Sequence, residues 1–388
     1  MDRRNFLGMS LTGAVGLTVG ASSAAGAAVA LNRRGEGAAG EAVVPFHGMH
    51  QSGISTPLQS HGTIVGFALR DDCDASRLQS LLRLWSADAA LLMSGRPAMG
   101  DAAPELARTP ASLTVTFGIA HAAFVRGGVE SKWPFAVTAI PAYAIDRLEP
   151  KWSGGDLFMQ VCANDAMTVS HAVRELIKDA RPFADVAWVQ SGSMPGVGIN
   201  PGETPRNHMG FKDGTGNPVP GTDIFDTTVW NDGSKQSWFA GGSAVAVRRI
   251  RIDMDRWEQV VPKDMEAAFG RHLTTGAPLG GTHELQPLDL EARKPDGTFV
   301  IPEDAHARRA FFPSDIFRRP FNYDDGPTDV GLLFIAYCAD IGQYLDIQAS
   351  LAHKDALNRW TTPIGSAMFV IPPGAPRLGA WIGETLFS

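Results

Sequence analysis

The chain has 388 residues, of which 44% are hydrophobic and 19% charged, so it can bury a sizeable core and general disorder is not expected. Its formal net charge of −7 comes without a block of like charges, which argues against nucleic acid as a main partner because phosphate binding needs a concentrated basic face. The three cysteines include no CxxC pair and cannot form a disulfide framework, which also disfavours a thiol-based enzyme.

The N-terminal segment has the pattern of an export signal. Arg3 and Arg4 precede Asn-Phe-Leu and a weakly apolar run from Met9 to about Val19, and small residues follow up to Ala30. This order is typical of a signal peptide, and the paired arginines resemble the twin-arginine signal. The apolar run is too short and too rich in glycine for a good membrane anchor. We expect a signal peptide and flexible leader over residues 1–43, and export by the twin-arginine machinery to the periplasm or the extracellular space.

Residues 44–200 alternate between strand and helix patterns. Amphipathic helices are expected around 78–85 and 169–177, because apolar side chains recur there three and four residues apart. His171 falls on the polar face of the second helix, where we expect it to be solvated. Short apolar or alternating runs predict the strands, which are 63–69, 113–117, 156–162 and 185–190.

Residues 201–388 repeat this order more loosely. Helices are expected over 264–273, closed by Gly276, and over about 351–360. The predicted strands are 244–252, 331–337 and 367–371. Each half therefore approximates a split βαβ unit, so we expect an α+β fold of two ferredoxin-like domains with antiparallel sheets, an N-terminal domain over 44–200 and a C-terminal domain over 201–388.

A segment rich in glycine and proline, residues 191–220, separates the halves and is too long for an ordinary connector. It contains the sequence GFKDG at 210–214, followed by Thr-Gly-Asn-Pro. Glycines around one acid let the backbone turn tightly and approach a flat ligand closely. The residue order does not suit a phosphate loop, and oxygen ligands are too few for a calcium loop. An ordinary Asp-Gly turn remains the alternative.

A histidine and four arginines gather ahead of the predicted strand 331–337. Alone, His306 reads as a surface or capping residue and the arginines as a solvated face. Together they form a positive patch that could hold carboxylates or phosphates. The arginines are Arg308, Arg309, Arg318 and Arg319.

These residues, taken in order, resemble the dye-decolourising peroxidase family. The sequence at 210–214 fits the family's GxxDG signature, and His306, the pair Arg318-Arg319 and the GLLFIAY strand at 331–337 follow in the family's order and spacing. The resemblance also covers 46–57, 154–164 and 275–279, and so runs through nearly the whole mature chain. GxxDG alone is a weak signal, whereas the ordered set is specific. Pro320 departs from the family, which often has a small or polar residue there.

The resemblance implies one haem b per chain, held in the C-terminal half with His306 as the proximal ligand of the iron. It implies Asp213 as the distal acid–base residue and Arg318 as the distal arginine, with Arg319 left open as the alternative. The carboxylate that orients His306 is not identifiable from the sequence. The other haem-binding residues that the resemblance implies are Gly210, Phe211, Lys212, Gly214, Thr215 and Phe334.

The implied activity is the reduction of hydrogen peroxide with one-electron oxidation of an organic reductant, dye-like or phenolic, through an iron–oxo haem. Because the base would be a carboxylate rather than an imidazole, activity is expected to persist into acid. The alternative is a haem-binding or iron-release protein of the same fold without peroxidase turnover, which would not need Asp213 paired with Arg318. A two-domain binder without haem and a chlorite dismutase-like enzyme are more remote alternatives. Assembly into a homo-oligomer stays open.

Overall fold

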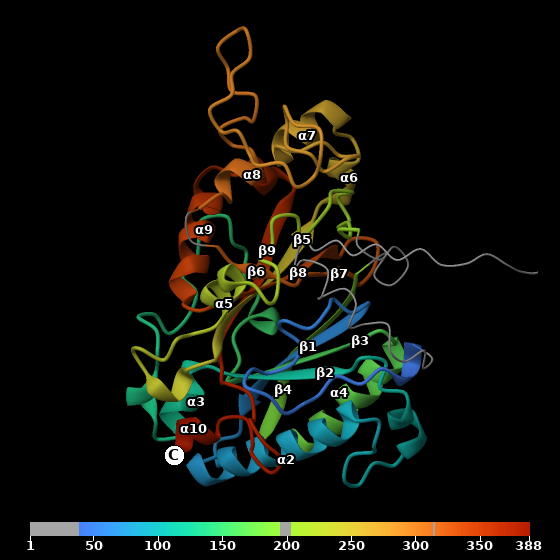
Figure 1. Cartoon of the computed structure of the whole chain (residues 1–388), viewed down its shortest axis with the longest axis vertical. Helices are drawn as coiled ribbons and strands as arrows, with labels where there is room; N and C mark the ends of the chain where they lie inside the picture. The colour runs from blue at the N-terminus through green and yellow to red at the C-terminus, as the bar shows by residue number, and fades with distance from the viewer. Residues whose placement is uncertain (1–38, 195–202, 313–314) are drawn as a thin grey trace, which may run out of the picture. The chain divides into compact units, whose positions relative to one another are not determined.

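Nine strands run through the part of the chain that the structure, a computed structural model, describes: residues 39–194, 203–312 and 315–388 (Figure 1). The predicted export signal lies outside these residues. The strands are β1 (His61–Leu69), β2 (Thr114–Ile119), β3 (Leu157–Ala163), β4 (Ala184–Ser193), β5 (Ser243–Ile252), β6 (Phe317–Arg318), β7 (Phe321–Asp324), β8 (Val330–Cys338) and β9 (Thr361–Ile371).

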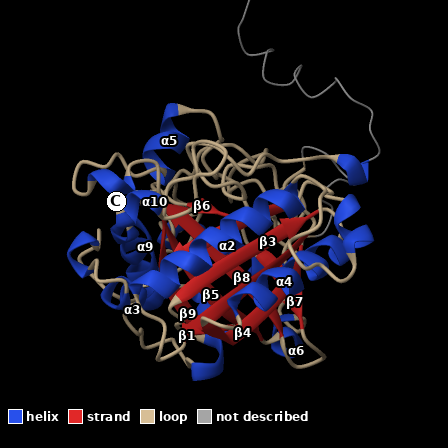
Figure 2. Cartoon of the chain, turned by 90° about the horizontal axis from the view of Figure 1, so that it is seen from below, coloured by secondary structure: helices blue, strands red, loops and turns tan. Residues whose placement is uncertain are grey.

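Helices cover these strands (Figure 2). The α-helices are α2 (Ala75–Met93), α3 (His121–Arg126), α4 (Ala166–Ala180), α5 (Asp223–Val229), α6 (Met254–Trp257), α7 (Pro262–Phe269), α8 (His306–Arg309), α9 (Ile341–Lys354) and α10 (Glu384–Phe387). Short 3₁₀ turns are η1 (Ala39–Glu41), η2 (Pro104–Arg108), η3 (Glu130–Lys132), η4 (Pro150–Trp152), η5 (Ser237–Phe239) and η6 (Ala356–Arg359).

The strand order confirms two ferredoxin-like units. The N-terminal strands lie in the order β4-β1-β3-β2, and the C-terminal strands in the order β9-β5-β8-β7, with every pair antiparallel. In both units the first and third strands are central, as a split βαβ unit requires. Single residue pairs join the two sheets at their edges, Ile119 with Val370 and Ser193 with Asn322. The division into domains at residue 200 stays a prediction, because residues 39–388 form one compact unit.

Both faces of strands β1, β2 and β3 are buried, which explains why these strands read as nearly continuous apolar runs. Along β1, Val65 and Phe67 belong to the core beneath α2 and α4. Ile64, which points the other way, packs in a second core with residues of the C-terminal sheet such as Val245 and Ile335. The two helices lie beside each other on one side of the N-terminal strands (Figure 1).

Two predicted helix boundaries are wrong. Helix α7 ends at Phe269, because Gly270 adopts a left-handed conformation with φ of 82° and caps it, so the closure at Gly276 is incorrect. The helix expected over 351–360 begins ten residues earlier, at Ile341, where Asp340 and Gln343 form a capping box. It ends at Lys354, and η6 follows as a separate turn.

No helix among the described residues is long and apolar enough to cross a membrane. The three cysteines are unpaired and buried. Burial raises the pKa of the Cys162 thiol to about 12, so this group stays a thiol at neutral pH. Burial also raises the pKa of the Cys338 thiol.

Candidate active site

The Gly-rich segment folds into a tight loop that presents Asp213. The backbone N–H of Asp213 donates to the carbonyl of Pro205 at 2.8 Å, which folds the chain back on itself. Gly210 and Gly214 have φ values of 87° and 120°, a region that residues with a Cβ rarely adopt. The backbone of the loop therefore requires glycine at these two positions of the signature. The side chain of Asp213 between them is 11% exposed.

Arg318 lies against this loop. Its Nη2 donates to the carbonyl of Thr215 at 2.8 Å, and its Nε donates to Oδ1 of Asn217 at 3.2 Å. The amide of Asn217 donates in turn to the carbonyl of Arg318 at 2.8 Å. These bonds leave Nη1 of Arg318 3.8 Å from Oδ1 of Asp213, a loose ion pair rather than a hydrogen bond.

Arg319 points away from the loop, because successive side chains of a strand face opposite sides. It is 2% exposed and donates to the carbonyls of Ile54 and Thr56 and to Oε1 of Gln59. The two adjacent arginines therefore have different surroundings, and only Arg318 approaches Asp213.

His306 begins the short helix α8, and Asp355 holds its ring. Nδ1 of His306 lies 2.6 Å from Oδ2 of Asp355, while Oδ1 of Asp355 accepts from the backbone N–H of Leu357 at 2.9 Å. Because a carboxylate only accepts, Nδ1 carries a hydrogen, and in the neutral imidazole Nε2 is the nitrogen with the lone pair. Burial lowers the pKa of His306, but the charge and hydrogen bond of Asp355 outweigh it, so the pKa lies above its ordinary value. Asp355 is the orienting carboxylate that the sequence did not identify.

The three predicted residues come together. The charges of Arg318 and Asp213 both act on the pKa of His306, the first lowering it and the second raising it, so His306 lies within electrostatic range of the pair. A pocket of about 260 Å³ reaches Asp213, Gly214, Asn217 and Arg318. The side chain of His306 is 33% exposed, so it is only partly covered by the protein.

The remaining predicted residues surround this site in different ways. Phe211 is 2% exposed and stacks on Phe269 at 3.7 Å between ring centroids, and Phe269 meets the ring of His306 edge-on at 6.0 Å. Phe334 is partly buried, and its ring lies 6.2 Å from that of Tyr344 in α9.

Lys212 and Thr215 bind a residue that the sequence reasoning missed, Glu284. Oε2 of Glu284 accepts from Nζ of Lys212 at 2.5 Å, and Oε1 accepts from the hydroxyls of Thr215 at 2.8 Å and of Thr204. Burial raises the pKa of Glu284, but these bonds outweigh it and lower the pKa overall. The contacts brace the loop from outside, and no sequence signal links Glu284 to a loop some seventy residues earlier.

The donor set fits a haem. An imidazole with one nitrogen held by a carboxylate and the other left for a metal is the usual protein ligand of haem iron in peroxidases. Phe269 provides an apolar wall beside His306, and Asp213 and Arg318 supply an acid–base group and a fixed positive charge at the same site.

Comparison with known proteins gives matches over most of the chain. The family described as "Dyp-type peroxidase, N-terminal" matches residues 51–193, and "Dyp-type peroxidase, C-terminal" matches residues 204–376. A dye-decolorizing peroxidase of Thermobifida fusca is 36% identical over 361 residues, which cover 87% of this chain and 84% of that protein. A deferrochelatase of Yersinia pseudotuberculosis is 33% identical over 374 residues, which cover 89% of this chain and 85% of that protein.

The fold has the same relatives. The crystal structure of a DyP-type peroxidase from Cellulomonas bogoriensis superposes with a TM-score of 0.87 at 40% sequence identity, covering 91% of this chain and all of that one. The predicted α+β fold with antiparallel ferredoxin-like units agrees with this structure.

Proposed function

The chain belongs to the Dyp-type peroxidase family, and we propose that His306, Asp213 and Arg318 form its peroxide-reducing site. It is a haem-dependent peroxidase that uses hydrogen peroxide and an organic reductant. The single observation that carries the assignment of these residues is that Arg318 pairs with Asp213 of the signature loop, within electrostatic range of an imidazole that a carboxylate holds.

Each residue has a separate task. The haem, when bound, would supply the iron that binds peroxide and would take up electrons from the reductant. His306 would hold the iron through Nε2, and Asp355 keeps a hydrogen on Nδ1 so that this atom is free in the neutral imidazole. Asp213 would move a proton from one peroxide oxygen to the other, so that the second oxygen can leave as water once a bound haem supplies the two electrons. Arg318 stabilises the negative charge that develops during this transfer.

Asp213 can perform this task because the loop limits its other contacts. Its Oδ2 accepts only a long hydrogen bond from the amide of Asn207, at 3.3 Å, and Arg318 stands 3.8 Å from Oδ1. Neither contact saturates the carboxylate, so lone pairs stay available for a peroxide proton. The hydrogen bonds of Arg318 to Thr215 and Asn217 fix the position of its charge.

The second candidate is haem binding with iron release, which the 33% identity to a deferrochelatase favours. A protein that only carries or dismantles haem gains nothing from an acid and a guanidinium placed together beside the imidazole. The presence of Asp213 and Arg318 at one site supports peroxidase turnover as the function of this chain.

The test is the reaction of the haem-loaded protein with one equivalent of peroxide, followed by ultraviolet–visible spectroscopy. Asp213→Asn should keep the Soret band and slow the reaction by roughly 10²–10⁴-fold, the usual contribution of a positioned base. His306→Ala should lose haem. Asp223→Asn, an exposed acid on α5, is the control and should match the unaltered protein. Full peroxide reactivity in Asp213→Asn would exclude this acid as the base.

We also propose export by the twin-arginine route, a proposal that rests on the sequence of the first 30 residues. Replacing Arg3 and Arg4 by lysine should leave the protein in the cytoplasmic fraction. The chain contains a matched control, since Arg33 and Arg34 form a second arginine pair in the predicted leader. Lysines at Arg33 and Arg34 should leave export unchanged, and equal export of both double variants would contradict the proposal.

A further inference from the structure

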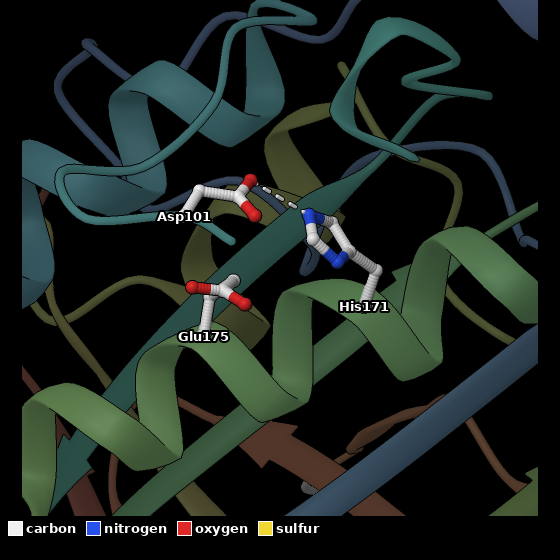
Figure 3. Close-up of side chains that lie close together, drawn as sticks. All are labelled: Asp101, His171 and Glu175. Atoms are coloured by element: carbon white, nitrogen blue, oxygen red, sulfur yellow. Dashed lines mark hydrogen bonds and ion pairs between the residues drawn. The ribbon is translucent and has the colours of Figure 1, made fainter. Parts of the chain in front are cut away.

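A buried group of acids and a histidine lies between α2 and α4, among N-terminal residues that the peroxidase mechanism does not use. His171 and Glu175 are four residues apart on α4 and so share one face of that helix. Asp101 comes from the loop after α2. The three side chains converge, and a ligand atom of each lies within 4.8 Å of those of the others (Figure 3).

These side chains are far less exposed than their chemistry favours. His171 and Asp101 have side-chain exposures of 2% and 1%, and Glu175 is 4% exposed. The prediction that His171 is solvated is therefore wrong. The loop 94–103 folds over the polar face of α4, and a helical pattern cannot show that a distant segment will cover it.

Part of the group has partners. One ring nitrogen of His171, Nε2, lies 3.0 Å from Oδ2 of Asp101, whose Oδ1 accepts from the backbone N–H of Ala103 at 2.8 Å. Oε2 of Glu175 pairs with Nζ of Lys178 at 2.5 Å. Each carboxylate is therefore oriented through one oxygen. The second oxygen of Asp101 contacts His171, and Oε1 of Glu175 is the second oxygen of the other carboxylate.

One atom of the group lacks a partner. Nδ1 of His171 is buried without a hydrogen bond. A buried polar atom left unpaired costs about 1–3 kcal/mol, so a native fold rarely keeps one without a ligand or water. Figure 3 shows the imidazole of His171 directed toward the space between the two carboxylates.

The group also carries an excess of negative charge. Asp88 and Asp179 join Asp101 and Glu175, and Lys178 is the lysine that pairs with this group. Burial, then the charge and hydrogen bond of Asp88, raise the pKa of Asp179 to about 7. Carboxylates that raise one another's pKa repel when both are ionised, and a cation beside them would relieve that repulsion.

We propose that Asp101, His171 and Glu175 bind a divalent transition-metal cation of the zinc class, with Asp88 and Asp179 as a surrounding negative shell. One imidazole and two carboxylates are a ligand set that such cations take, whereas calcium and magnesium prefer oxygen alone. Ligand atoms around zinc lie about 2.0–2.2 Å from the metal and hence roughly 3.3–3.6 Å apart, so atoms within 4.8 Å need to close by about 1 Å. The cation would tie the loop after α2 to α4 and would stabilise the fold without touching the haem.

The competing explanation is a network of shared protons and buried water that needs no metal. It predicts that the chain retains no zinc, and that zinc leaves its thermal stability unchanged. A metal site predicts the opposite, because a ligand that binds the native state alone raises its stability.

The experiment uses the haem-loaded full chain without an affinity tag, treated with a chelator and then titrated with Zn²⁺ in a calorimeter. We expect one Zn²⁺ per chain, counted separately from haem iron by elemental analysis, and a rise of the unfolding temperature by a few degrees. His171→Gln and Glu175→Gln should each weaken binding at least ~10-fold. Mg²⁺ should not compete, because it prefers oxygen ligands.

His121→Gln is the matched control. His121 forms a more exposed pair with Glu130 at 3.6 Å, and its loss should leave zinc binding intact. Binding that is absent, or equally strong in His171→Gln and Glu175→Gln, overturns the proposal. Should these variants fail to fold, anomalous scattering at the zinc edge from crystals of the unaltered protein decides the question. A peak among the three side chains supports the site, and a peak elsewhere or none rejects it.

Discussion

At the scale of single residues, the two adjacent arginines show how one position along a strand separates chemistry from packing. Arg318 donates to the loop that carries Asp213, whereas Arg319 donates to three acceptors contributed by residues 54–59. The sequence left the choice between them open. Arg318 ends β6, and Arg319 continues the extended chain through a bond from its N–H to the carbonyl of Ile335. Successive side chains of extended chain face opposite sides, so the two arginines point in opposite directions.

Arg318→Ala and Arg319→Ala should therefore have different consequences. The first should keep haem and slow the peroxide reaction by roughly 10²–10³-fold, the usual cost of losing a fixed charge at a transition state. The second leaves buried acceptors unpaired, so it should lower stability while the rate per bound haem stays nearly unchanged. Stopped-flow spectroscopy and urea unfolding measure the two effects. A large loss of rate per haem in Arg319→Ala alone would reverse the assignment.

The identity of the base predicts the dependence of activity on pH. A carboxylate loses its ability to accept a proton only when it is protonated, and carboxylates ordinarily titrate near ~4, well below the ~6.5 of histidine. The rate of peroxide reduction should therefore persist as pH falls below 6.5, provided that the Soret band shows haem still bound. An acid limb centred near ~6.5 would indicate an imidazole base instead.

At the scale of elements, the proximal side depends on three short pieces of chain that meet. Helix α8 presents His306, α9 ends just before Asp355, and η6 begins just after it. The two oxygens of Asp355 have different partners: Oδ1 accepts from the N–H of Leu357 and caps η6, and Oδ2 accepts from Nδ1 of His306. The sequence predicted His306 as a ligand by resemblance, but the boundary of α9 was misplaced, so the position of Asp355 between two helices was not visible.

Asp355→Asn tests this arrangement. If the amide oxygen keeps the bond to the N–H of Leu357, its NH₂ group faces Nδ1 of His306 and favours the tautomer that puts a hydrogen on Nε2. Haem should then dissociate roughly 10–100-fold more readily, as measured by transfer to an excess of apomyoglobin. Glu266→Gln, which disturbs a comparable pair with His272 at 3.0 Å, is the control. Equal haem retention in both variants would show that Asp355 does not support the ligand.

At the scale of the whole described unit, buried charge joins the two ferredoxin-like halves. Arg248 in β5 is 1% exposed and pairs with Asp146, which precedes β3 in the N-terminal half and is itself 9% exposed. The two side chains are 1% and 3% exposed, so the pair is almost completely shielded from water. A buried ion pair contributes little more to stability than a pair of apolar side chains of similar volume. Removing one partner is costly, because the other charge then stays buried without a counter-charge.

Asp146→Ala should lower the free energy of unfolding by roughly 3–5 kcal/mol, because it leaves the guanidinium of Arg248 buried without a counter-charge. Asp185→Ala removes the exposed pair with Arg70, whose side chains are 70% and 47% exposed, and should cost less than about 1 kcal/mol. Urea unfolding of the haem-loaded proteins makes the comparison. Similar losses in both variants would mean that the buried pair is solvated.

The sequence by itself determined most of the strands, the helix faces of α2 and α4, and the family, because each depends on local periodicity or on residues in a fixed order. It also singled out Asp213 and His306 as candidate site residues, because their neighbours carry the family's motifs. Only the tertiary structure decided which arginine approaches Asp213, which carboxylate holds His306, and that His171 is buried with Asp101 and Glu175. Those facts depend on contacts between segments tens of residues or more apart, and hydrophobic periodicity records which face of an element is covered but not which distant side chain covers it.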